Sequence, residues 1–150
     1  MKFLKQFLRL FSARRSEQEP EGTRPILPSS LLARYLIDRT HFSPQKGTVH
    51  ASAFLPPKDL QLSVFHITGL PEADVWSIGE KFVAGPSKRS IRARADITAK
   101  SVSSPLSLDP DDDPPRHVSV VGWPKEKSEQ KLIAAQLALL AKLSMKDRSG

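Results

Sequence analysis

Thirteen prolines divide this 150-residue chain into short segments and limit the regular elements that it can form. Proline lacks an amide hydrogen and disfavours helical geometry in the residue before it, so helices and strands usually end near a proline. Pro56 and Pro57 separate two apolar segments, Pro71 follows one of them, and Pro124 ends a third. With 39% hydrophobic residues, the chain is typical of a folded domain with stiff connections rather than of a disordered chain.

The segment 91–98 has the clearest strand pattern. Apolar residues at 91, 93, 95 and 97 alternate with Arg92, Arg94, Asp96 and Thr98, which we expect on an outer, polar face. The segments 49–55, 60–68 and 116–123 also predict strands, whereas 29–36, 72–83 and 128–145 predict helices, the first only by a narrow margin over a strand. The fold class is therefore α+β: four or five short, mostly antiparallel strands with the helices 72–83 and 128–145 packed on one face.

The helix 128–145 has a broad leucine-rich face. We expect this face to be the buried one, with Ala134, Ala138 and Ala141 on the opposite side. Gln136 falls within the leucine-rich face and would need a hydrogen-bond partner if that face is in the core. The leucine-rich face consists of Leu132, Ile133, Leu137, Leu139, Leu140 and Leu143.

The positive charge is concentrated at the N-terminus. The first fifteen residues contain five basic residues and no acidic one, whereas the rest contain 18 basic and 16 acidic residues, so +5 of the net +7 belongs to this segment. We expect an amphipathic basic helix over 1–15, a linker over 16–27, a single domain over 28–146 and a disordered tail over 147–150. The helix is too short and too charged to span a membrane.

The N-terminal helix is predicted to dock on a partner protein, on a membrane surface or on the chain's own domain. Its apolar face would bury several large side chains, and its basic face suits an anionic lipid surface. The predicted docking residues are Phe3, Leu4, Phe7, Leu8 and Phe11 on the apolar face, with Lys2, Lys5 and Arg9 on the basic one.

Each of the four histidines is followed two positions later by a hydroxyl residue. On a strand, residues two apart share a face, so an imidazole and a hydroxyl would project together. Two such pairs, His66 with Thr68 and His117 with Ser119, resemble the paired signature of two-histidine phosphoesterases, which would act on RNA ends or cyclic nucleotides. The alternative is that these are strand histidines with local hydrogen bonds.

A second polar set is expected on the sheet. Arg92, Arg94 and Asp96 would meet Arg116 and His117 if the strands 91–97 and 116–123 pair, giving a ligand surface for phosphate or carboxylate groups. The alternative is a solvated outer face. Nucleic-acid binding through the basic tail and the segment 88–94 is a further alternative.

Several chemistries are excluded or not indicated. The chain has no cysteine, so it has no disulfide, thiolate metal site or cysteine nucleophile. The aspartates at 109, 111, 112 and 113 lack the glycine and the distal glutamate of a calcium loop, and we interpret them as a stiff solvated loop. We therefore expect no metal and no cofactor.

Four segments resemble a group of small bacterial proteins of unknown function. The shared pattern is HFS followed by AF-x-PP, then LSVF followed by GL and W, RAD, and PPRH followed by VGWP. The resemblance spans about residues 31–143 and implies no particular activity. With the N-terminal helix, it leads us to expect a non-enzymatic bacterial accessory or adaptor protein, cytoplasmic or peripheral at the membrane.

Overall fold

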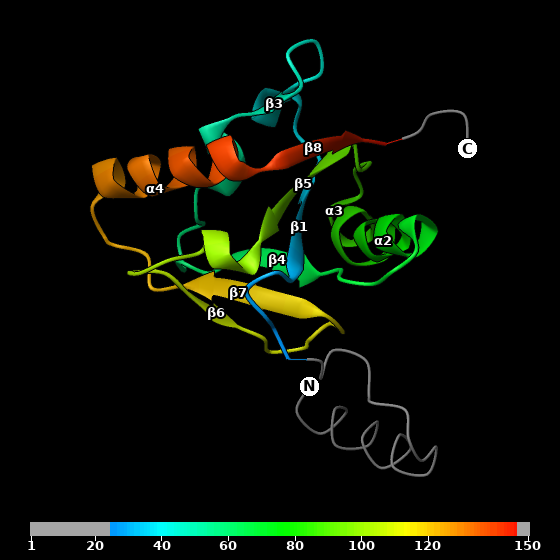
Figure 1. Cartoon of the computed structure of the whole chain (residues 1–150). Helices are drawn as coiled ribbons and strands as arrows, with labels where there is room; N and C mark the ends of the chain where they lie inside the picture. Colours follow the sequence, from blue (N-terminus) through cyan, green and yellow to red (C-terminus); the bar gives the residue numbers. More distant parts are fainter. Residues whose placement is uncertain (1–24, 147–150) are drawn as a thin grey trace.

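The computed structural model of the chain describes residues 25–146 and is organised around a six-stranded sheet (Figure 1). The strands lie in the order β6–β7–β4–β1–β5–β8, and every neighbouring pair is antiparallel. The predicted α+β class is confirmed. The strand bounds are β1 Leu31–Leu36, β4 Leu62–His66, β5 Ala93–Thr98, β6 Ser107–Asp109, β7 His117–Val121 and β8 Lys142–Met145.

Helices cover both faces of the sheet rather than one. On one face lies α2 (Glu72–Gly79), which continues as a π-helical segment, η3 (Glu80–Ala84), and a short α3 (Gly85–Ser87). On the other face lie α4 (Lys127–Leu140) and the 3-10 helix η2 (Ala51–Phe54) (Figure 1). The prediction of a single helical face was wrong, because the sheet has two buried faces and each requires a cover.

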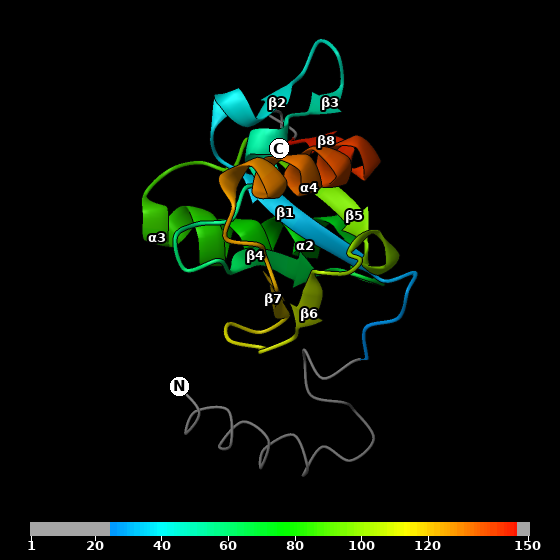
Figure 2. The same ribbon diagram turned by 90° about the vertical axis from the view of Figure 1, so that its left-hand side faces the viewer.

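The α4 face holds the larger apolar core. Leu32 and Leu36 of β1 and Leu62 of β4 pack there with Phe54 of η2, and all four are almost completely buried. Each such side chain contributes roughly 1.5–3 kcal/mol of hydrophobic stabilisation. A small sheet of β2 (Phe42–Ser43) and β3 (Thr48–Val49) lies beside α4 and β8 and extends this core (Figure 2).

The orientation predicted for α4 was wrong. Ala134, Leu137 and Ala138 are buried, whereas Leu132 and Leu139 are 68% and 87% exposed. The two alanines, one turn apart, allow the helix backbone to approach the sheet closely, which leucines would prevent. Gln136, which the sequence placed on the inner face, is exposed and needs no buried partner.

The C-terminal segment also differs from the prediction. The helix ends at Leu140, and Ala141 is already extended. Residues Lys142–Met145 then pair with β5 as an edge strand. A continued helix would have left this edge of β5 unpaired, and the strand satisfies its backbone hydrogen bonds.

Two other segments were assigned to the wrong element. Residues 31–36 form β1 rather than a helix, since Leu32 and Leu36 pack on one side of the sheet and Ala33 and Tyr35 on the other. A strand buried on both faces shows no polar alternation, so its sequence resembles that of a buried helix. Residues 51–54 form η2 instead of a strand, which brings Phe54 under α4. The strands within 60–68, 91–98 and 116–123 are confirmed.

The α2 face holds a smaller apolar cluster, in which helix and sheet approach closely. Tyr35 donates a hydrogen bond from its hydroxyl to the Val75 carbonyl, and its ring packs edge-on against Phe65. A Cβ added at Gly79 would lie 2.5 Å from the Tyr35 ring, so glycine is needed at this contact.

The predicted N-terminal helix and most of its linker lie outside the described residues, as does the tail 147–150. The docking residues between positions 2 and 11 are therefore not placed. No helix among residues 25–146 combines the length and the apolar character needed to cross a lipid bilayer.

Candidate active site

A serine, a histidine and an aspartate are joined by hydrogen bonds where β4, β7 and the β6–β7 loop meet. Ser63 Oγ lies 2.9 Å from His117 Nε2, and His117 Nδ1 lies 2.7 Å from Asp111 Oδ1. The imidazole thus connects a hydroxyl on one ring nitrogen with a carboxylate on the other. In this connectivity a histidine can accept the proton of a serine nucleophile while the carboxylate holds the ring in place.

The register of β4 against β7 brings the serine and the histidine together. Ser63 pairs with Ser119, and Phe65 pairs with His117, so Ser63 and His117 are diagonal neighbours on the α2 face. The Phe65 ring packs edge-on against the imidazole, with 5.3 Å between the ring centroids. Ser63 and His117 are therefore carried by paired strands rather than by loops.

The loop between β6 and β7 supplies the aspartate. Its Asp111 amide donates to the Asp109 carbonyl at 2.9 Å, and its Asp112 amide to the His117 carbonyl at 3.1 Å. The Asp111 carboxylate also accepts a bond of 3.3 Å from Ser119 Oγ on its second oxygen. These contacts hold the carboxylate against the imidazole on a loop that the sequence presented only as solvated.

Arg116 ties the end of this loop to β4. Its φ of 72° is in the left-handed region, and its Nη1 donates to the His66 carbonyl at 2.9 Å. The Arg116 carbonyl in turn accepts the His66 amide at 2.9 Å. Arg116 is therefore a buried structural residue that fixes the start of β7, and it does not project into a ligand surface.

A cavity of about 350 Å³ opens beside Ser63 and His117. Phe65 and Phe82, whose rings stack with centroids 6.3 Å apart, form part of its apolar wall. Ser63 is exposed, and its hydroxyl makes no other hydrogen bond within residues 25–146. A small substrate in this cavity would lie next to the serine hydroxyl.

Arg34 brings a positive charge to the same cavity. The pairing of β1 with β4 ends at Ala33 and Phe65, and beyond it Arg34 Nη1 donates to the Ser63 carbonyl at 3.1 Å. Its Nε donates to the Ala53 carbonyl at 2.9 Å. Burial lowers the pKa of Arg34 to about 10, so the guanidinium stays charged at neutral pH, and no carboxylate of the described residues pairs with it.

His66 and His117 do not form a catalytic pair. His66 is adjacent in β4 to Phe65, which faces the same side as His117, so the His66 side chain lies on the opposite face of the sheet. Its Nε2 lies 3.0 Å from Thr68 Oγ1, as the local pairing predicts. The arrangement of His66, Thr68, His117 and Ser119 around one phosphodiester is not what the structure presents.

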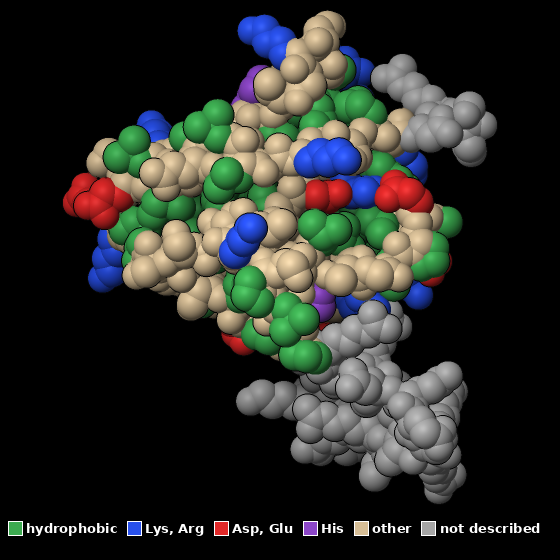
Figure 3. All heavy atoms as spheres, viewed as in Figure 1, with side chains coloured by type: hydrophobic (Ala, Val, Ile, Leu, Met, Phe, Trp, Pro, Cys, Tyr) green, Lys and Arg blue, Asp and Glu red, His purple; other side chains and the backbone are tan. Residues whose placement is uncertain are grey.

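Arg94 and Asp96 form a second polar cluster, under α2 rather than on a solvated face. Arg94 donates to Glu72 at 2.8 and 2.9 Å and to Asp96 at 3.0 and 3.1 Å, and its guanidinium lies 4.7 Å from the centre of the Trp76 ring. Figure 3 shows acidic and basic side chains meeting where α2 covers the sheet. Burial disfavours the charged guanidinium, but its partners Glu72 and Asp96 outweigh this and raise the pKa of Arg94.

The two polar clusters are separate. β4 and β1 lie between β7 and β5, so Arg94 and Asp96 are about three strand spacings, roughly 14 Å, from the His117 strand. The expected surface of Arg92, Arg94, Asp96, Arg116 and His117 therefore does not assemble. Arg92 lines a different cavity, and Arg116 is buried against β4.

The sequence did not identify Ser63 or Arg34, and it interpreted Asp111 as part of a solvated loop. Ser63 and Phe65 share a face by strand alternation, which was readable, but nothing in the chain indicates which strand pairs with β4. A His-x-Ser segment preceded by an aspartate-rich loop could have suggested a histidine–carboxylate contact.

Within residues 25–146, no group of three or more histidine and acidic side chains could hold a metal ion. The chain matches no protein-family model, no curated protein and no solved structure, so its function is inferred from this geometry alone.

Proposed function

We propose that this protein is a serine hydrolase that cleaves a small ester, with Ser63 as nucleophile, His117 as general base and acid, and Asp111 as the orienting carboxylate. The observation that carries the proposal is the pair of hydrogen bonds at 2.9 and 2.7 Å through the two nitrogens of one imidazole, beside a cavity. The three roles follow from chemistry that recurs on unrelated folds.

In the first step, Ser63 Oγ attacks the ester carbonyl carbon while its proton passes to His117 Nε2. The resulting imidazolium is stabilised by Asp111, which accepts the Nδ1–H at 2.7 Å. Collapse of the tetrahedral intermediate breaks the bond to the leaving alkoxide, which takes the proton from His117. Water then repeats the sequence on the acyl-serine and releases the acid.

Arg34 supports the step in which negative charge develops on the carbonyl oxygen. Its guanidinium is hydrogen-bonded to the Ser63 carbonyl and lines the same cavity. A fixed positive charge near the nucleophile, in a partly buried site, stabilises an oxyanion more strongly than water would. Both hydrogen bonds of Arg34 go to backbone carbonyls, so in this proposal it acts on the oxyanion through its charge alone.

The size of the cavity limits the substrate. A volume of about 350 Å³ is at the lower end of small-molecule sites, and Phe65 and Phe82 make one wall apolar. A short-chain acyl ester fits these dimensions and this chemistry. The adaptor function expected from the sequence depends on residues 2–11, which lie outside the described part of the chain, and it stays a prediction.

A fluorophosphonate probe tests the proposal directly, because it forms a stable adduct with a serine that is activated by a histidine. We expect one adduct on the full-length protein, located at Ser63 by peptide mass spectrometry. Ser63→Ala and His117→Asn should abolish labelling, and Ser107→Ala, which removes an exposed strand serine on β6, should not change it.

Hydrolysis of p-nitrophenyl acetate gives the matching activity measurement. Asp111→Asn should lower kcat at least about 10³-fold by allowing the wrong imidazole tautomer, with little change in KM. A folded wild-type protein that is neither labelled nor active, or labelling that survives Ser63→Ala, would overturn the proposal.

A further inference from the structure

A second and larger cavity is lined by residues of η1 (Arg39–His41), β2 and η3, of the segment just before β5 and of the end of β8. Its volume is about 710 Å³, within the range of small-molecule sites, and neither Ser63 nor His117 lines it. Arg39 and Arg92 line it together with Phe42 and Met145. The proposed hydrolase site leaves this cavity without a function.

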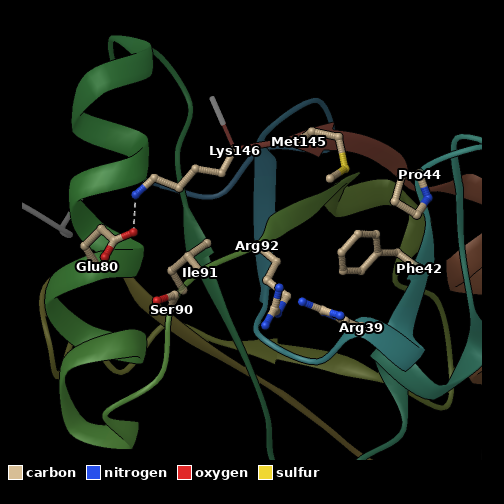
Figure 4. A pocket seen from close by; sticks show the side chains of 9 residues that line it. All are labelled: Arg39, Phe42, Pro44, Glu80, Ser90, Ile91, Arg92, Met145 and Lys146. Carbon is tan, nitrogen blue, oxygen red and sulfur yellow. Dashed lines mark hydrogen bonds and ion pairs between the residues drawn. The ribbon is translucent and has the colours of Figure 1, made fainter. Parts of the chain in front are cut away.

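The two arginines are directed toward one another. Figure 4 shows the guanidinium groups of Arg39 and Arg92 converging, with the Phe42 ring beyond them. Neither side chain makes a hydrogen bond or an ion pair with any other residue between 25 and 146. Two positive charges that line one cavity repel each other, and a bound anion would remove that repulsion.

The neighbouring charged groups do not supply this anion. Lys146 and Glu80, on the far side of the cavity, form an ion pair with each other. Asp38, adjacent to Arg39 in the chain, accepts hydrogen bonds from the backbone amide and the hydroxyl of Thr40. The counter-charge for Arg39 and Arg92 is therefore absent from this part of the described chain.

The backbone around Arg92 is fixed from both sides. Its amide donates to the Leu36 carbonyl at 2.8 Å, and its carbonyl accepts the Lys146 amide at 3.1 Å. The backbone of Arg92 is thus hydrogen-bonded to β1 on one side and to the residue after β8 on the other, which fixes the position from which its side chain extends. A site built on paired strands holds its geometry better than one built on a free loop.

Another wall of the cavity, next to Arg39, is apolar. Phe42 is buried except at this surface, and Met145 and Pro44 flank it. A flat apolar group can pack against the phenyl ring and the thioether while a charged group reaches the arginines.

We infer that this cavity binds a small organic phosphate whose phosphate group bridges Arg39 and Arg92 and whose flat apolar body packs on Phe42 and Met145. A phosphate monoester carries a charge of about −1.5 to −2 at neutral pH, which matches two guanidinium groups. Its oxygens accept paired hydrogen bonds from each arginine, which a carboxylate can offer to only one of them.

Naphthyl phosphate is a suitable probe, and Met145 is a suitable reporter. The chain has only two methionines, Met1 and Met145, so ¹³C-methyl labelling gives a spectrum that Met145→Leu assigns. We expect naphthyl phosphate to shift the Met145 methyl signal through the naphthyl ring current. Naphthol and naphthoate should bind at least about tenfold more weakly, because they lack the dianionic group.

Substitutions distinguish specific binding in the cavity from nonspecific attraction of the anionic probe to a basic protein. Arg39→Gln and Arg92→Gln should each weaken naphthyl phosphate binding at least about tenfold, whereas Lys125→Gln, which removes an equal charge elsewhere, should change it less than about twofold. Arg39 is exposed, so its variant is expected to fold even if the Arg92 variant does not. Ser63→Ala should bind as the wild type does, which separates this site from the proposed active site. Binding that survives both arginine substitutions, or an unshifted Met145 signal, would overturn the inference.

Discussion

The two faces of the sheet differ in what they bury. The α4 face buries large apolar side chains such as Phe54 and Leu36 with few polar partners, whereas the α2 face combines a smaller apolar cluster with the Ser63 site and the Arg94 cluster. The α4 face therefore contributes the larger share of the hydrophobic stabilisation, and the α2 face holds the proposed active site. Such a separation allows polar groups to be placed on the α2 face without weakening the main core.

The largest effect is expected on the α4 face. Phe54, the last residue of η2, is completely buried under α4, so Phe54→Ala should lower the free energy of unfolding by about 3–5 kcal/mol. Phe82→Ala, at the wall of the smaller cavity on the α2 face, should lower it by less, because Phe82 is only half-buried. Urea denaturation of both variants measures the contrast, and equal losses would contradict it.

Removing one buried charge should produce the next largest effect. Arg94→Leu leaves Asp96, whose side chain is only 10% exposed, without its cation, so it should cost about 3 kcal/mol of stability. Glu72→Gln should cost less than about 1 kcal/mol, because the Glu72 side chain is 67% exposed. The double variant Arg94→Leu with Asp96→Leu should recover most of the loss, and no recovery would mean that the cation also acts through Trp76.

A glycine substitution tests the close approach of α2. Gly79→Ala should destabilise the protein by about 1–3 kcal/mol, because the new Cβ would overlap the Tyr35 ring, although alanine is the better helix former. At Gly85 a Cβ would meet, apart from its chain neighbours, only the Glu80 carbonyl oxygen, at 3.4 Å. Gly85→Ala should therefore cost less than Gly79→Ala, and its remaining cost comes from Pro86, which disfavours helical geometry in the residue before it. A stabilised Gly79→Ala variant would show that the helix is free to move off the sheet.

The smallest effect is a pair of opposite pH dependences around one arginine. The hydrogen bond from Arg94 lowers the pKa of Glu72, so the stability that Glu72 contributes is present above about pH 4.3 and is lost on acidification. Burial raises the pKa of Asp96 despite Arg94, so its contribution is present below about pH 3.9 and is lost as the pH rises through the folded-state pKa.

Denaturation experiments between about pH 3 and pH 6 test whether the contributions of Glu72 and Asp96 to stability change with pH in opposite directions. The stability difference between the wild type and Glu72→Gln should increase with pH, and the difference between the wild type and Asp96→Asn should decrease. If both stability differences change with pH in the same direction, burial does not outweigh Arg94 in setting the pKa of Asp96.

Elements with a clear local pattern were predicted correctly from the sequence, whereas features that depend on packing against distant segments were not. The alternation in 91–98 identified β5, and Pro71 marked the start of α2, because both signals are local. Residues 31–36 were assigned to a helix because a strand buried on both faces has no polar alternation. The outer position of Leu139 was missed because close packing of α4 selects alanines for the inner face.

The candidate site was only partly predictable, because its members come together through strand order. His117 was identified as a candidate from its local pattern, and its link to Asp111 spans six residues. Ser63 is 54 residues from His117, and the contact exists only because β7 is placed beside β4. No local pattern encodes that choice of neighbour.

The register of β4 against β7 decides whether Ser63 and His117 lie on the same face of the sheet. A slip of one residue would turn His117 to the opposite face and put Arg116 or Val118 beside Ser63. It would also expel Val118 and Val120 from the apolar core, where both are fully enclosed. The burial of these two valines, which have no reactive atom, thus fixes the strand register on which the proposed site depends. A sheet with shifted register would lose both its stability and its reactivity.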